Sequence, residues 1–65
     1  MNEVAVLEHL SEKLAQRRSE LAESLAEGGV TDFPAYRELC GVIRGLLTAQ
    51  MEIGDLVRTL KANHD

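Results

Sequence analysis

The feature that most constrains the fold is an unbroken seven-residue repeat in the second half of the chain. Between residues 36 and 60, mostly apolar side chains recur at alternating steps of three and four residues. This spacing is typical of a helix that packs along its length against another helix, and the line of side chains between the two is called the seam below. The seam positions are Tyr36, Leu39, Ile43, Leu46, Gln50, Ile53, Val57 and Leu60.

The first half of the chain carries a second, less regular apolar stripe. Strong helix formers fill most other positions between 3 and 27. Arg17 and Arg18 stand where another leucine would complete the stripe, and their aliphatic stems can cover a seam while the guanidinium groups reach water. The stripe consists of Val4, Leu7, Leu10, Leu14, Leu21 and Leu25. Of these, we expect Leu7, Leu14 and Leu21 to contact the second helix.

A short joint separates the two helical segments. Gly28 and Gly29 end the first helix, because glycine readily adopts the left-handed turn that follows a helix. Asp32 or Thr31 can cap a new helix, and Pro34 suits its first turn. A joint this short favours antiparallel neighbours. The sequence therefore predicts one all-α domain, residues 1–65, folded as an antiparallel, coiled-coil-like two-helix hairpin with helix one at 3–27, joint at 28–32 and helix two at 33–62.

The second segment is apolar beyond its seam, which predicts a partner. Two helices bury too little apolar surface to offset the ordering entropy of so many residues. We therefore expect the hairpin to be completed by oligomerisation or by docking on a larger assembly; the alternative is a marginally stable monomer. The additional apolar residues are Cys40, Val42, Leu47, Ala49, Met51 and Leu56.

Three glycines inside the second segment sharpen this expectation. Each weakens a helix by roughly 1 kcal/mol relative to alanine. Gly41, Gly45 and Ala49 are spaced by four residues and form a smooth strip away from the seam. Such a strip lets another backbone approach closely, so we expect it to be an interface; the alternative is a surface helix that tolerates glycine. Gly54 is the third of these glycines.

Gln50 is the polar member of the seam. A polar residue at such a position can fix the register of the packed helices at a cost in stability. The alternative interpretation is a residue at the exposed end of a bundle. We favour the first.

Composition and charge disfavour several classes of partner. Eleven acidic residues against seven basic ones give a net charge of −4, so we expect binding neither to nucleic acid nor to an anionic membrane. The N-terminal residues lack a basic region before an apolar one, and charged residues interrupt every apolar run, so we expect neither a signal peptide nor a membrane-spanning helix. Arginines at 17, 18, 37 and 44 invite an RNA hypothesis, but glutamates share helix one with two of them.

Catalytic and metal-binding motifs are weak. Cys40 with His9 or His64 would be a nucleophile pair, but nothing in the spacing brings them together, and a small buried hydrophobe is the simpler interpretation of the cysteine. His9 and Glu12 share a helix face as two metal ligands would, yet the di-metal bundles use the reverse order and further glutamates. We expect no enzyme, no metal and no cofactor.

One resemblance concerns the joint and the segments around it. Residues 17–21, the Gly28-Gly29 pair, residues 32–37 and residues 41–46 resemble small helical-hairpin proteins encoded among the structural and packaging genes of tailed bacteriophages. The resemblance implies a minor virion component, present in many copies, that packs against itself or against a larger capsid, portal or tail protein. Without it, a cytoplasmic location is expected. The alternative function is a small dimeric helical-bundle regulator that binds RNA or a protein partner.

Overall fold

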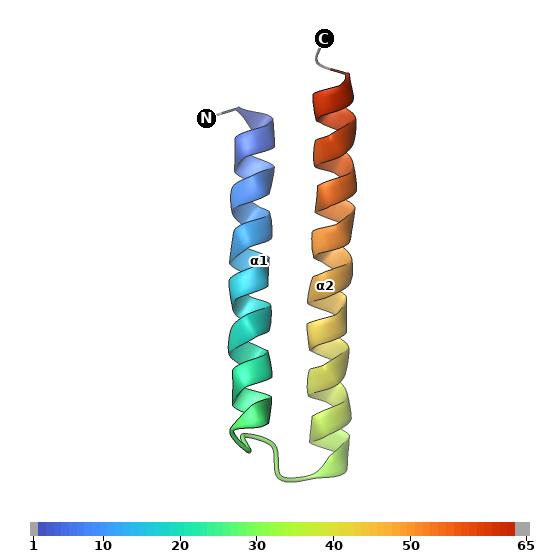
Figure 1. The fold of residues 1–65 in the computed structure, drawn as a ribbon. Helices are drawn as coiled ribbons and strands as arrows, with labels where there is room; N and C mark the ends of the chain where they lie inside the picture. The colour runs from blue at the N-terminus through green and yellow to red at the C-terminus, as the bar shows by residue number, and fades with distance from the viewer. Residues whose placement is uncertain (1, 64–65) are drawn as a thin grey trace.

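The computed structural model describes residues 2–63, which form two long helices, α1 (Glu3–Ala26) and α2 (Phe33–Ala62). The helices run antiparallel side by side and are joined at one end by a short connection (Figure 1). The molecule is a rod with extents of 51 × 17 × 12 Å. The all-α antiparallel hairpin predicted from the sequence is thus confirmed; the ranges expected for its helices were 3–27 and 33–62.

Side-chain caps fix where both helices begin. The Asn2 carboxamide oxygen accepts a hydrogen bond of 2.8 Å from the backbone N–H of Ala5, a cap that the sequence interpretation missed although asparagine is a strong N-cap residue. At the start of α2, the Asp32 carboxylate accepts an equivalent bond of 2.8 Å from Ala35. Of the two caps considered for α2, Asp32 is therefore the one used.

Both glycines of the joint are required by the end of α1. Gly28 has a φ of +80°, in the left-handed region that other residues rarely adopt. Its N–H donates to the Leu25 carbonyl, and the N–H of Gly29 donates to the Ser24 carbonyl at 2.8 Å, which together make a Schellman motif. A Cβ on Gly29 would lie 2.8 Å from that carbonyl oxygen. The first glycine therefore supplies the conformation and the second permits the close approach.

The core between the helices is shallow. Val57, at 8% exposure, is the one buried side chain among the described residues, and the other seam residues are half-buried or exposed. Near the open end of the rod, the Lys61 ammonium lies 3.2 Å from the Glu8 carboxylate across the helix pair. Both side chains are exposed, so this ion pair contributes at most about 1 kcal/mol. The hairpin therefore depends on a narrow line of apolar contact.

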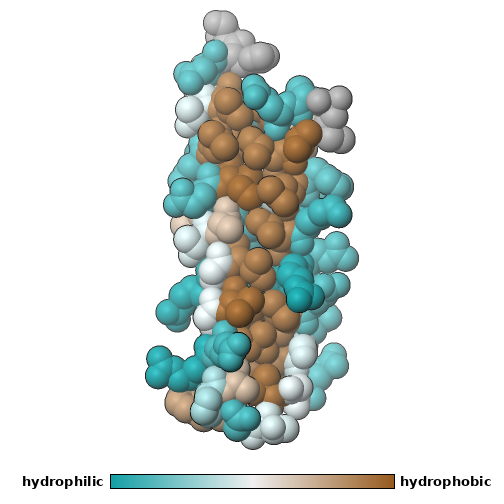
Figure 2. All heavy atoms as spheres, turned by 180° about the vertical axis from the view of Figure 1, so that it is seen from behind, coloured by the Kyte–Doolittle hydropathy of each residue, from teal (hydrophilic) through white to brown (hydrophobic). Residues whose placement is uncertain are grey.

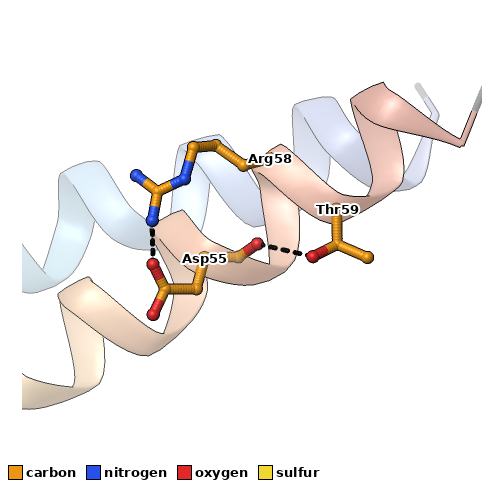
Figure 3. Close-up of polar contacts among 3 residues, drawn as sticks. All are labelled: Asp55, Arg58 and Thr59. Atoms are coloured by element: carbon orange, nitrogen blue, oxygen red, sulfur yellow. Dashed lines mark hydrogen bonds and ion pairs between the residues drawn. The ribbon is translucent and has the colours of Figure 1, made fainter.

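Local polar contacts stabilise α2 on its outward side. Arg58 forms an ion pair with Asp55 one turn earlier, and the Thr59 hydroxyl donates to the Asp55 carbonyl at 3.1 Å (Figure 3). These contacts lie within one helix and are exposed, so they support the helix without linking it to α1.

Candidate interaction surface

Most of the seam residues predicted on α2 lie where the helices meet. Val57 is buried; Leu39, Ile43, Leu46, Gln50, Ile53 and Leu60 are half-buried, as are Leu7, Leu14 and Leu21 on α1. Tyr36 differs, because it is 45% exposed near the joint, where its ring stacks on that of Phe33 with centroids 6.2 Å apart. Half-burial is what a hairpin without further neighbours gives, because each helix has a single partner.

The stripe expected on α1 needs a correction. Leu10, placed on it from the sequence, is 44% exposed, whereas its neighbour Ser11 is half-buried. Apart from Ala5 and Ala15, the half-buried residues of α1 follow a strict seven-residue register that skips Leu10 and includes Arg18, while Arg17 is exposed. The overlapping three- and four-residue steps hid this register, and counting sevens from Val4 would have found it. The seam of α1 is Val4, Leu7, Ser11, Leu14, Arg18, Leu21 and Leu25.

Gln50 meets one of the two polar residues on the α1 seam. Its side-chain amide donates a long hydrogen bond of 3.5 Å to the backbone carbonyl of Ser11. Its other polar atom, Oε1, is buried and has no hydrogen-bond partner among the described residues. This contact lies midway along the rod, so the interpretation of Gln50 as a residue at the exposed end of a bundle is wrong.

The two glycines of the small-residue strip lie away from α1. Gly41 and Gly45 are exposed, and Ala49 is half-buried. A Cβ added at Gly41, Gly45 or Gly54 would meet nothing within 4 Å. No contact inside the hairpin therefore requires a glycine at these positions, although each costs helix stability.

Large apolar side chains remain exposed on two sides of the seam. A continuous hydrophobic band runs over both helices from one end of the molecule to the other (Figure 2). By their positions in the seven-residue repeat, Leu10 of α1 and Val42 and Leu56 of α2 lie on the same side of the seam. Val6 lies at the α1 edge of that side. Because both helices are right-handed, this side faces away from the viewer in Figure 1 and toward the viewer in Figure 2. We call these four residues the back face.

The opposite side, here the front face, draws its exposed apolar residues from α2 alone: Phe33, Tyr36, Leu47 and Met51. Phe33 and Met51 are 68% and 63% exposed. A shallow depression near the joint is lined by Phe33, Tyr36, Cys40 and two arginines, among others. A side-chain hydrogen bond with Cys40, and the charge of that thiol when it ionises, raise the pKa of Tyr36 above its ordinary value of 10.0. The sequence interpretation had not placed Val6 or Phe33 in an interaction surface.

The three alternatives from the sequence are a nucleophile pair, a metal site and an RNA-binding surface, and the described residues do not form any of them. Among residues 2–63, no group of three or more potential ligands could hold a metal ion. Cys40 and His9 lie on different helices, and His64 is outside the described residues. Of the four arginines that suggested RNA binding, Arg18 is half-buried in the seam. Glu20, Glu23 and Glu27 line a shallow depression beside the joint. The described surface therefore offers no continuous basic face.

Within the described part of the chain, neither helix combines the length and hydropathy that a membrane crossing needs. The chain matches no protein-family model, and no curated protein or solved structure matches it significantly.

Proposed function

We propose that the protein is a non-enzymatic structural or assembly module that presents an apolar helical face to copies of itself or to a larger protein. The observation that carries the proposal is the mismatch between the size of the chain and its exposed surface. The chain exposes 5088 Å², whereas a folded monomer of 7.2 kDa ordinarily exposes about 4,100 Å². The excess, about 1,000 Å², is comparable to what one partner contributes to a standard protein interface.

The composition of that surface supports the same conclusion. Eight large hydrophobic residues are exposed, and one side chain is buried among those described. Isolated hydrophobic residues on a surface are normal, but a band that spans both helices is typical of an interaction site. Covering it would add the apolar burial that two helices cannot supply to each other.

The setting that we propose is the virion of a tailed bacteriophage, where the module would pack against a capsid, portal or tail protein. This part rests on the resemblance of the joint and its flanks to small hairpin proteins of that kind. Symmetric particles hold their repeating structural components in many copies, which suits a short chain with an uncovered face. Mass spectrometry of purified particles tests it: the peptide is expected at a fixed copy number per particle, and its absence would overturn the virion setting.

Sedimentation equilibrium combined with circular dichroism on the whole chain tests the need for a partner. We expect either a helical oligomer or a chain that is largely unfolded by itself. A helical monomer at micromolar concentration that unfolds cooperatively at high temperature would overturn the proposal, because the uncovered surface would then need no partner. Met51→Glu serves as the solubility control, because it removes one exposed apolar side chain of the front face. The large exposed apolar residues of that face all come from α2.

The same preparation separates an assembly module from a regulator that binds RNA. An RNA regulator would bind RNA with an affinity that falls steeply as salt is raised. With a net charge of −4 and Arg18 in the seam, we expect no such binding.

A further inference from the structure

We propose that a second copy of this chain packs on the back face, with α1 of each copy against α2 of the other. This inference rests on the proposed function, because it identifies the partner of the apolar surface as the chain itself. The product would be a four-helix bundle with a twofold axis parallel to the rods.

The two faces differ in which helices supply the apolar residues. On the back face, Val6 and Leu10 come from α1 and Val42 and Leu56 from α2, and the hydrophobic band covers both helices (Figure 2). The exposed apolar residues of the front face belong to α2 alone. A second hairpin has two helices, and each of them must bury its apolar surface against a helix of the first copy. The contact face must therefore have apolar residues on both α1 and α2. The back face fits this requirement.

The area of the face also fits a second copy. The broad side of the rod measures 51 × 17 Å between its outermost Cα atoms, which is about 870 Å². A standard interface buries roughly 800 Å² on each partner. Two rods laid lengthwise would thus form an interface of ordinary size and remove most of the surface excess described above.

Charges along the edges of the back face favour one pairing. The α1 side carries Lys13 and Arg17, both exposed and without an ion-pair partner among residues 2–63, and the same seven-residue count also puts Glu3 and Glu20 on that side. Counting sevens puts Glu38 and Glu52 on the α2 edge, which carries no cation. Packing α2 against α2 would bring four carboxylates together, whereas packing α1 against α2 places cations beside carboxylates.

The heights of these charges along the rod agree with that pairing. Two contacts between the helices bracket their common levels, that of Gln50 with Ser11 and that of Lys61 with Glu8. Counting along the antiparallel helices from each contact puts Lys13 level with residues 48–56 of α2 and Arg17 level with residues 44–52. A twofold axis parallel to the rods preserves these heights. Lys13 then lies within four residues, about 6 Å, in height from Glu52 of the second copy, within reach of two long side chains.

Disulfide trapping between singly substituted chains tests the pairing directly. In a Cys40→Ser background, one chain carries Arg17→Cys and the other Gly45→Cys, two positions at nearly the same height on opposite edges. Each chain then has one thiol, so any disulfide joins two copies. We expect the mixture to form a cross-linked dimer under mild oxidation and each chain alone to form little. Ser19→Cys mixed with Gly45→Cys is the control, because the heptad count puts Ser19 on the opposite side of α1.

Sedimentation of the unsubstituted chain separates failure of this inference from failure of the proposed function. A dimer that gives the mixed cross-link supports both. A dimer that cross-links mainly between two identical positions overturns the pairing and leaves self-association standing. A chain that shows no self-association overturns the inference, while the proposal of a larger protein partner is then tested on the purified particles.

Substitutions on the two faces provide a second readout. Leu10→Lys with Leu56→Lys would place cations within the proposed interface and raise the dimer Kd by about a hundredfold, roughly tenfold for each residue. Leu47→Lys with Met51→Lys, on the front face, should change the Kd less than about threefold. Equal effects from both pairs would overturn the assignment of the back face. The cross-linking result remains decisive if a lysine variant does not fold.

Discussion

Replacing Gln50 with leucine should stabilise the hairpin, although it removes the one side-chain hydrogen bond between the helices, among residues 2–63, that is not an ion pair. The Oε1 atom of Gln50 is buried without a partner in this part of the chain, and leaving a polar atom in that state costs about 1–3 kcal/mol. The bond from its amide to the Ser11 carbonyl, at 3.5 Å, is at the limit of hydrogen bonding and returns little of that cost. Leucine fills a similar volume with apolar atoms.

The expected gain for Gln50→Leu is about 1–2 kcal/mol in the free energy of unfolding, or roughly 4–8 °C in Tm for each kcal/mol in a domain of this size. Thermal unfolding followed by circular dichroism measures it, with both proteins at one concentration because association shifts Tm. Gln16→Leu is the matched control: Gln16 is exposed on α1, and the change should stay within about 0.5 kcal/mol. A Tm for Gln50→Leu equal to or below that of the unsubstituted chain would refute the reasoning.

Four further outcomes follow from the structure. Gly41→Ala should stabilise α2 by about 1 kcal/mol, because the added methyl group meets nothing within 4 Å; a lower Tm would contradict this. Val57→Ala should destabilise the hairpin by roughly 2 kcal/mol in urea unfolding, because it removes the one buried side chain among those described; no change would mean that the helices do not pack as observed. Asp32→Ala should cost about 1 kcal/mol through loss of the α2 cap, with Asp32→Asn retaining most of the stability. In an ultraviolet titration, Cys40→Ala should move the pKa of Tyr36 down toward 10.0; because the folded pKa is the raised one, the stability that this residue contributes is present below pH 10 and lost as pH rises through the folded pKa, and an unchanged titration would refute the contact.

Local signals in the sequence were sufficient for the helices and the joint. Gly28 and Gly29 mark the end of α1 because one must adopt a left-handed conformation and the other must pass close to a carbonyl oxygen. Asp32, one of the two caps that the sequence offered, marks the start of α2 because its side chain satisfies a free N–H of the first turn. These interactions span a few residues, so no knowledge of the tertiary structure is needed to infer them.

Local signals in the sequence did not determine which residues of α1 contact α2. Both Leu10 and Ser11 continue a helical stripe from Leu7, and leucine is the more hydrophobic choice. The structure selects Ser11, because the seven-residue register set by α2 must be matched along the whole of α1. Leu10 is thereby left on the surface, where it contributes to the back face.

The sequence by itself therefore determined that the chain forms two amphipathic helices joined by a short turn, since capping, glycine conformation and periodicity act over one or two helical turns. The tertiary structure decided which of the overlapping apolar stripes meet and which remain exposed. Burial depends on the register between two helices, and a register is a property of the pair.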